Sequence, residues 1–236
     1  MEYKNYRNAI VLCDKEYMDK DIPIGASKMG GFPDLPPEIE YPTMSAHTET
    51  WASDGKTDFY EKSAMQLVAQ INLYELAETG ADVENLLPEK GMLYIFWSGS
   101  NEYVEIHCDE PAKKDIQKVI YWNGDMSTLR RTQPPCPYYS KYFENDIIKE
   151  CFPERAVDFS EQMECGDDDD EDFYADKLFG FPYGVNKPWI ADDEVSLFQF
   201  DGCIFGGCVW YVYWIMKQKD LKNLNFSHIA LECDMD

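Results

Sequence analysis

The sequence predicts an α+β fold that is rich in β-structure, with mixed sheets, short helices and two related halves. Aromatic residues, which favour strands, make up 15% of the 236 residues. The chain also shows seven or more predicted strands with only short helices between them. Three motifs near the front of the chain also recur, in the same order, near its back.

The recurring motifs predict an internal duplication. The pairs are Ser27–Pro33 (SKMGGFP) with Asp176–Pro182 (DKLFGFP), Gln66–Ile71 (QLVAQI) with Val195–Phe200 (VSLFQF), and Gly91–Trp97 (GMLYIFW) with Cys208–Trp214 (CVWYVYW). The number of residues that separates the two members of a pair decreases from the first pair to the third, as expected if insertions and deletions accumulated in the loops between the motifs. We therefore predict a single domain over residues 1–236, with related halves at approximately 9–125 and 160–236.

In the first half, apolar runs predict strands at residues 9–13, 65–71, 92–97, 103–108 and 118–122. The run Met92–Trp97 is apolar throughout, so both of its faces should be covered. Gly25–Pro42 holds four prolines and should be extended and aperiodic. Asn72 can cap a short helix through Ala77, and Asn123–Asp125 is a hairpin signal where a strand follows it.

The region from Pro137 to Phe159 should be irregular or partly helical. Residues 161–172 should form a loop, because the six adjacent acidic side chains at 167–172 repel one another. Further strands are predicted at 195–200, 208–216 and 229–233. Asp220 can cap a short helix over 221–224.

The chain is strongly acidic, with 45 acidic against 21 basic residues and a formal net charge of −24. This charge argues against binding to nucleic-acid phosphates or to an anionic membrane surface. It would attract a basic protein partner, although it could equally serve solubility alone. The oligomeric state stays open.

The N-terminus lacks the basic and apolar regions of a signal peptide. The longest apolar run, Cys208–Met216, is far shorter than the ~20 residues of a membrane helix. We therefore expect a cytoplasmic protein whose eight cysteines are free thiols. No Cys or His spacing resembles a common zinc site, and the run 167–172 lacks the glycine and the glutamate of an EF-hand, so neither a metal nor a cofactor is predicted.

Six side chains are candidates for ligand binding. The repeated lysines could anchor a carboxylate or phosphate, or could simply pair with one of the many carboxylates. The repeated glutamines are buried amides that need partners, either backbone or ligand. An Asn and an Asp each follow a glutamine by two residues and so share its strand face. The candidates are Lys28, Gln70, Asn72, Lys177, Gln199 and Asp201.

No catalytic residue is predicted. The chain has three histidines, His47, His107 and His228, and no hydrolase motif accompanies them. The glycines Gly30 and Gly31 are not followed by the remainder of a nucleotide-binding loop. The lack of a catalytic motif favours a protein that is not an enzyme, and the enzymatic alternative stays open.

Several segments together resemble the YwqG-like proteins, a bacterial family whose domain has no assigned function. The matching segments are Gly25–Pro36 (GASKMGGFPDLP), Leu67–Leu76 (LVAQINLYEL), Leu87–Phe96 (LPEKGMLYIF), and Phe226-Ser227 with Glu232–Asp234. The resemblance runs from about residue 9 to 236. Departures are Tyr41-Pro42 in place of Trp-Pro, Asn225 in place of an aspartate, and the acidic run at 167–172. The resemblance implies a mixed α/β fold of two related halves and implies no reaction.

Two functions follow as hypotheses. The first is a non-enzymatic module that binds a basic protein. An immunity role against a toxin is an analogy here, since relatives sometimes occur near bacterial toxin systems. The second is a small-molecule-binding protein or enzyme with a cleft between the two halves, lined by the repeated Lys and Gln residues and Asp201.

Overall fold

The computed structural model describes residues 6–16, 21–44, 62–98, 116–139, 147–148, 151–165, 176–201 and 209–235. This part of the chain is mostly β-structure. The strands of its largest sheet are β1 (Tyr6–Asp14), β2 (Lys28–Met29), β6 (Gln66–Asn72), β7 (Met92–Trp97), β8 (Gln117–Trp122), β12 (Arg155–Cys165), β13 (Lys177–Phe179), β14 (Glu194–Asp201), β15 (Val209–Lys217) and β16 (Ala230–Met235).

These ten strands pair in the order β16-β15-β14-β13-β1-β12-β2-β6-β7-β8. Every neighbouring pair is antiparallel, so the sheet is not the mixed sheet that we expected. Three small two-stranded sheets accompany it: β3 (Asp34–Leu35) with β9 (Arg130–Arg131), β4 (Thr43–Met44) with β5 (Ser63–Ala64), and β10 (Tyr138–Tyr139) with β11 (Ile147–Ile148). The helices are short: α1 (Leu73–Thr79), α3 (Gln218–Lys222) and the 3-10 turn η2 (Met126–Thr128).

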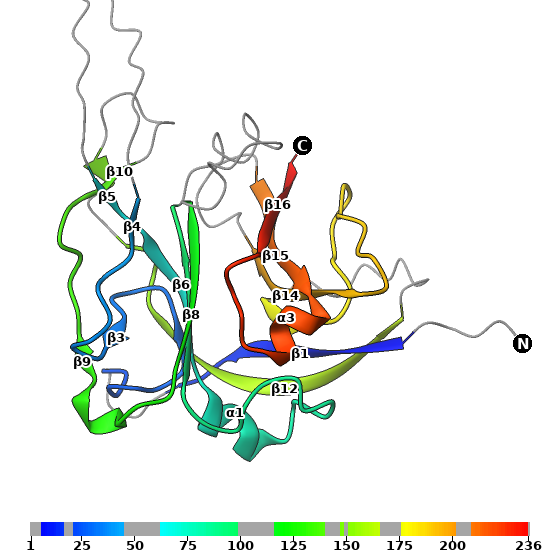
Figure 1. The fold of residues 1–236 in the computed structure, drawn as a ribbon, viewed down its shortest axis with the longest axis horizontal. Helices are drawn as coiled ribbons and strands as arrows, with labels where there is room; N and C mark the ends of the chain where they lie inside the picture. Colours follow the sequence, from blue (N-terminus) through cyan, green and yellow to red (C-terminus); the bar gives the residue numbers. More distant parts are fainter. Residues whose placement is uncertain are drawn as a thin grey trace, which may run out of the picture.

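The long strands β1 and β12 form the middle of the sheet, paired from Tyr6 opposite Cys165 to Asp14 opposite Val157. We call β2, β6, β7 and β8 the first arm, and β13, β14, β15 and β16 the second arm. Figure 1 shows both arms rising on the same side of the β1–β12 pair. The sheet therefore bends about its central pair, and the inner faces of the two arms turn toward one another.

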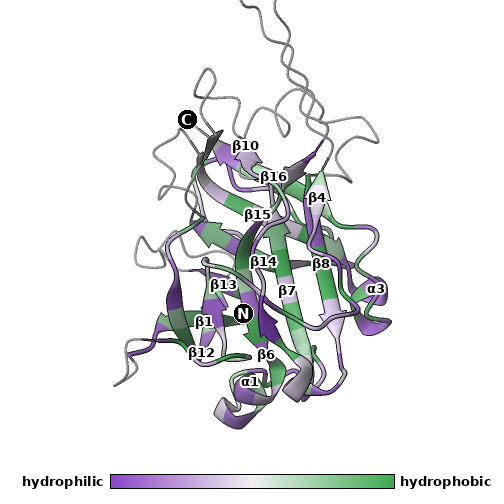
Figure 2. Cartoon of the chain, turned by 90° about the vertical axis from the view of Figure 1, so that its left-hand side faces the viewer, coloured by the Kyte–Doolittle hydropathy of each residue, from purple (hydrophilic) through white to green (hydrophobic). Residues whose placement is uncertain are grey.

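Both faces of each arm are covered by protein. All six residues of β7 are buried, as predicted from its unbroken apolar run, and Figure 2 shows hydrophobic residues along this strand. In β15, Val212, Trp214 and Met216 belong to the main core, while Tyr211 and Tyr213 belong to a separate cluster. Because successive side chains on a strand point to opposite faces, the two clusters lie on opposite sides of the second arm.

Aromatic rings connect the two arms across the main core. The Phe152 ring, from the segment before β12, has its centroid 6.3 Å from the ring of Trp97 in β7 and 5.9 Å from that of Phe200 in β14. The Phe152 backbone N–H also donates to Gln66 Oε1 at 2.9 Å. One residue outside both arms thus packs against each of them.

Most predicted elements are confirmed. The strands expected at 9–13, 65–71, 92–97, 118–122, 195–200, 208–216 and 229–233 correspond to β1, β6, β7, β8, β14, β15 and β16. Asn72 caps α1, where its side chain accepts a hydrogen bond from the Tyr74 N–H. The strand expected at 103–108 and the acidic run at 167–172 lie outside the described residues.

Three local predictions were wrong. Residues 155–165, expected to be irregular and then a loop, form β12, the longest strand of the large sheet. Its backbone pairs with β1 and β2, which does not require an apolar sequence. The turn at Asn123–Asp125 leads into η2 rather than a hairpin strand, because the Asp125 side chain caps that turn at Ser127.

The third wrong prediction is that Asp220 caps the second helix. This helix, α3, begins at Gln218, two residues before Asp220. Lys217 occupies the capping position without a side-chain bond, and Asp220 lies in the first turn. In the described part of the chain, no helix has the length and apolar character needed to span a membrane.

Candidate functional site

Each arm carries a lateral row of three polar side chains, one from each of three adjacent strands. In each row a lysine lies opposite a glutamine, and the glutamine lies opposite a tyrosine on the next strand. Residues that face each other across paired strands share one face of the sheet. The first row is Lys28, Gln70 and Tyr94, and the second row is Lys177, Gln199 and Tyr213.

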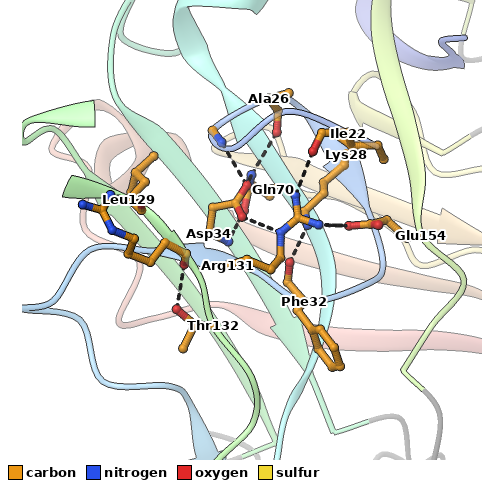
Figure 3. Close-up of polar contacts among 12 residues, drawn as sticks. Ile22, Ala26, Lys28, Phe32, Asp34, Gln70, Leu129, Arg131, Thr132 and Glu154 are labelled. Carbon is orange, nitrogen blue, oxygen red and sulfur yellow. Dashed lines mark hydrogen bonds and ion pairs between the residues drawn. The ribbon is translucent and has the colours of Figure 1, made fainter. Parts of the chain in front are cut away.

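The lysine of the first row is fully buried and has two partners (Figure 3). Lys28 Nζ donates to the backbone carbonyl of Phe32 and, at 2.7 Å, to Glu154 Oε1. Burial lowers the pKa of the Lys28 amine, and the Glu154 carboxylate opposes that shift. Through its bond to the Phe32 carbonyl, the amine holds the loop that follows β2.

The glutamine and tyrosine of this row hold the same loop at Asp34. Gln70 Oε1 accepts from the Asp34 N–H at 2.7 Å, and Gln70 Nε2 donates to Asp34 Oδ2 and to the Ala26 carbonyl, each at 2.9 Å. The Tyr94 hydroxyl donates to the Asp34 carbonyl at 2.7 Å. The buried glutamine amide therefore has its partners within the protein.

Arg131 joins the two carboxylates of this network. Its Nε lies 2.6 Å from Asp34 Oδ1, its Nη1 lies 2.8 Å from Glu154 Oε1, and its Nη2 donates to the Ile22 carbonyl at 3.0 Å. Asp34 is fully buried, and the bond from Arg131 offsets the cost of burying its carboxylate. Figure 3 shows Arg131 reaching into the loop from β9.

The second row makes the same kinds of contact. Lys177 Nζ donates to Glu164 Oε1 at 2.6 Å and to the Phe181 carbonyl at 2.7 Å. The Phe181 N–H in turn donates to Glu164 Oε2 at 2.7 Å. Burial lowers the pKa of the Lys177 amine, against the opposing effect of Glu164.

The rest of the second row holds Tyr183, six residues after its lysine, as Asp34 is six residues after Lys28. Gln199 Oε1 accepts from the Tyr183 N–H at 2.8 Å, and the Tyr213 hydroxyl donates to the Tyr183 carbonyl. The structural counterpart of Tyr94 is therefore Tyr213, two residues beyond the Tyr211 that the aligned motifs indicated. Both rows anchor the loop that follows the lysine strand.

The candidate residues do not converge on one site. β1 and β12 separate the two lysine strands, so Lys28 and Lys177 are three strand spacings apart, at least about 14 Å along the sheet. Asn72 stays in the first arm, where its Nδ2 donates to the Gly25 carbonyl at 2.8 Å. A ligand-binding role for these residues stays a prediction. Side-chain contacts with neighbouring loops are seen for five of them: Lys28, Gln70, Asn72, Lys177 and Gln199.

A pocket does lie where the two arms and the start of β12 meet. We call it the seam pocket; its volume is about 210 Å³. Apolar side chains from both arms and from the segment before β12 make much of its wall: Met29, Val68, Phe152 and Phe200. Of the six candidates, Asp201 is among its lining residues.

The charged groups of the seam pocket form a connected set. Arg155 Nη2 pairs with Asp176 Oδ2, and Arg155 Nη1 lies 2.5 Å from Oδ1 of the exposed Asp14. Asp176 Oδ1 accepts from the Asp201 N–H at 2.8 Å. Burial raises the pKa of the Asp176 carboxyl to about 6, Arg155 opposes this, and the Asp201 charge adds to it.

Gly30 allows the close approach that shapes one side of this pocket. It has a φ of +63°, and a Cβ there would lie 2.2 Å from the Pro153 carbonyl oxygen and 2.7 Å from that of Phe152. Its N–H donates to the Val68 carbonyl at 3.1 Å. Only glycine combines this conformation with contact between two backbones.

Sequence reasoning missed Arg155 and Asp176, although one signal was present. In the repeated motif Asp176 occupies the position that matches Ser27, and each side chain accepts a hydrogen bond from a backbone N–H on the neighbouring segment of its arm. Ser27 Oγ accepts from the Asn72 N–H at 2.9 Å, as Asp176 accepts from the Asp201 N–H at 2.8 Å. The exchange of a neutral residue for a charged one at matched positions distinguishes the two arms.

Among the described residues, no group of three or more His, Cys, Asp or Glu side chains is placed to hold a metal ion. The residues that line the seam pocket supply apolar side chains, two carboxylates and an arginine. A carboxyl with a pKa near 6 can also exchange a proton close to neutral pH.

Comparison with known families places the chain. The family described as a domain of unknown function, DUF1963, matches residues 27–234, which includes both arms except Met235. The chain belongs to the DUF1963 family. A 96-residue stretch of this DUF1963 protein is also 28% identical to a non-seed lectin of Pisum sativum. That match covers 40% of the chain and 36% of the length of the pea protein.

Proposed function

We propose that this DUF1963 protein is a small-molecule-binding protein whose ligand occupies the seam pocket. One observation carries the proposal: an apolar cavity at the junction of two matched arms contains a buried carboxyl with a raised pKa beside an arginine. Ligand sites are typically concave and apolar with a few placed polar groups. Shifted pKa values also gather at functional sites.

A ligand screen with a blocked pocket tests this. Small molecules, including monosaccharides because of the likeness to the pea lectin, are screened by ligand-observed NMR against the wild type. The same screen is run on Val68→Phe, which fills the pocket, and on Val185→Phe, which adds an equal volume at a side chain that is 86% exposed. We expect hits that are lost in Val68→Phe alone. No hits, or hits that persist in a folded Val68→Phe protein, would refute the proposal.

A second candidate is recognition of a basic protein, with an immunity-like role as one form of it. The formal net charge of −24 favours this, since complementary charge speeds and selects association. Affinity capture from the native host at low and high salt tests it. A basic partner should be retained at low salt and released at high salt, and the absence of any partner at low salt would count against it.

We also infer that the two arms descend from one duplicated unit and that the chain is related to the YwqG-like proteins. The matched rows and the loops that they anchor support the duplication. The signature segments Gly25–Pro36, Leu67–Leu76 and Leu87–Phe96 support the resemblance. Superposition of the β2–β6–β7 unit on the β13–β14–β15 unit in an experimental structure should align the lysine, glutamine and tyrosine of both rows. Failure to align them would contradict the duplication.

A further inference from the structure

We propose that Cys136 and Cys151 form a reversible disulfide that fastens the segment before β12 to the segment before β10. Both residues are partly buried thiols in the structure, and they belong to separate segments of the chain. The inference concerns a site apart from the seam pocket and does not depend on a ligand there.

Hydrogen bonds hold the two cysteine segments at one place in the fold. Pro137 follows the first cysteine, and its carbonyl accepts from the Ala64 N–H at 3.0 Å. Phe152 follows the second cysteine, and its N–H donates to Gln66 Oε1 at 2.9 Å. Ala64 and Gln66 are two residues apart in the chain, a span of at most about 7 Å. The two bonds therefore bring both cysteine segments close together.

A pair of tyrosines lies beside both thiols. The hydroxyls of Tyr41 and Tyr138 are joined by a hydrogen bond of 3.0 Å. Burial is the main cause of the raised pKa of each hydroxyl, and the charges of Cys136 and Cys151 add to it at both tyrosines. Because such electrostatic effects weaken with distance, both sulfurs lie near the same hydroxyl pair.

The backbone around the two thiols is suited to closing a disulfide. A disulfide needs Cα atoms about 4.4–6.8 Å apart and a defined torsion about the S–S bond. β10 begins at Tyr138 and β12 begins at Arg155, so neither cysteine is part of a strand. Each segment is thus free of a strand ladder at its cysteine and can adjust to this geometry.

Glutathione disulfide is the class of oxidant that we assign to the reaction. One protein thiolate attacks a sulfur of glutathione disulfide and releases a first glutathione, and the second protein thiolate then displaces the other glutathione from the mixed disulfide. Two electrons pass from the protein thiols to glutathione disulfide, and the two protons go to the two glutathione thiols that are released. Burial raises the pKa of the Cys136 thiol, with Lys62 opposing, so exchange should be faster at higher pH.

The disulfide would act on the segment that joins the two arms. Phe152 follows Cys151, and its ring packs against Trp97 of one arm and Phe200 of the other. Closing a loop of about 15 residues also restricts the unfolded chain, which should raise the midpoint of thermal unfolding by about 5–10 °C.

Mass spectrometry of the full chain tests the proposal. The protein is reduced with dithiothreitol, desalted and equilibrated with excess glutathione disulfide at about pH 8, where a larger fraction of each thiol is ionised. Remaining thiols are blocked with N-ethylmaleimide before digestion without reductant. We expect a linked peptide pair that joins Cys136 to Cys151 and disappears after renewed reduction. Circular dichroism should show the higher midpoint for the oxidised protein.

Single cysteine variants supply the controls. Cys136→Ser and Cys151→Ser should each lose the linked peptide and the rise in midpoint, and the remaining cysteine should accumulate a mixed disulfide with glutathione. Cys13→Ser is the matched control, because it removes an exposed cysteine of β1. It should keep both the linked peptide and the rise.

The wild-type protein alone decides the proposal, so a variant that fails to fold does not affect it. No Cys136–Cys151 peptide in excess glutathione disulfide, or links that join other cysteines or two copies of the chain, would show the proposal to be wrong. A disulfide that forms but leaves the midpoint unchanged would overturn the fastening of the segment. None of these results bears on the seam pocket, which the ligand screen tests separately.

Discussion

The raised pKa of Asp176 predicts that this residue makes the protein less stable as the pH rises. The carboxyl is 11% exposed and its pKa is raised from 3.8 to about 6, chiefly by burial. Between these two values the folded protein binds more protons than the unfolded chain. The free energy of unfolding therefore falls as pH increases through this window, and the loss is complete above the folded pKa.

The size of the effect follows from the shift. A difference of about two pKa units corresponds to about 3 kcal/mol over the whole range, at about 1.4 kcal/mol per unit. Of this total, the free energy of unfolding changes by about 2 kcal/mol between pH 4.5 and pH 7 according to the linkage relation. The groups that surround the carboxyl are Arg155, Asp201 and, through Arg155, Asp14.

Urea unfolding of wild type and Asp176→Asn across pH 4.5 to 7 measures this contribution. Other titrating groups are shared by the two proteins, so the difference between the curves isolates Asp176. We expect the wild type to lose about 2 kcal/mol relative to the variant as the pH rises over this interval. A flat difference, or a relative gain by the wild type, would show that the ion pair with Arg155 outweighs burial and would refute the reasoning.

Two further predictions concern the anchored loops. Gly30→Ala should lower the free energy of unfolding by more than about 3 kcal/mol, and Gly80→Ala by only about 1–2 kcal/mol. Both glycines have a positive φ, but a Cβ at Gly80 would have nothing within 4 Å, whereas a Cβ at Gly30 would meet backbone atoms. Lys177→Met should lower the free energy of unfolding by about 3–5 kcal/mol, because it leaves the buried Glu164 without its cation. Lys28→Met should cost less, because the carboxylate partner of Lys28 still pairs with Arg131.

Denaturant unfolding measures the free energy of unfolding for the two glycine variants and for the two lysine variants. Equal costs at the two glycines would show that the backbone contact at Gly30 relaxes. Equal costs at the two lysines would show that the arginine does not compensate in the first arm. Adding Glu164→Gln to Lys177→Met should recover part of the loss, since it removes the unpaired charge.

The strands that the sequence predicts correctly are those whose side chains are buried on at least one face. Met92–Trp97 is continuously apolar because both faces of β7 are covered, and that pattern is readable without a structure. The cap at Asn72 is equally local, since it needs only the residues that follow it. β12 was missed because its pairing on both edges uses backbone groups and its side chains are largely polar.

The sequence predicted the matched placement of the repeated lysines but not the residues that they contact. The repeated motifs correctly pointed to Lys28 and Lys177 as equivalent positions, because the same local loop follows each. Their partners Glu154 and Glu164 lie at or near the two ends of β12, 126 residues after Lys28 and 13 residues before Lys177. No local pattern indicates either pairing. The expectation of one shared cleft lined by these lysines therefore did not match their placement.

The residues alone show recurring motifs, most of the strands and the acidity of the chain. These properties depend on residue types and on neighbours in the chain. The tertiary structure decides that the repeated polar residues anchor loops, and that a pocket opens where Arg155, Asp176 and Asp201 meet. The physical reason is that burial and charge pairing arise between distant segments, and these set both the use of a buried lysine and the pKa of a buried carboxyl.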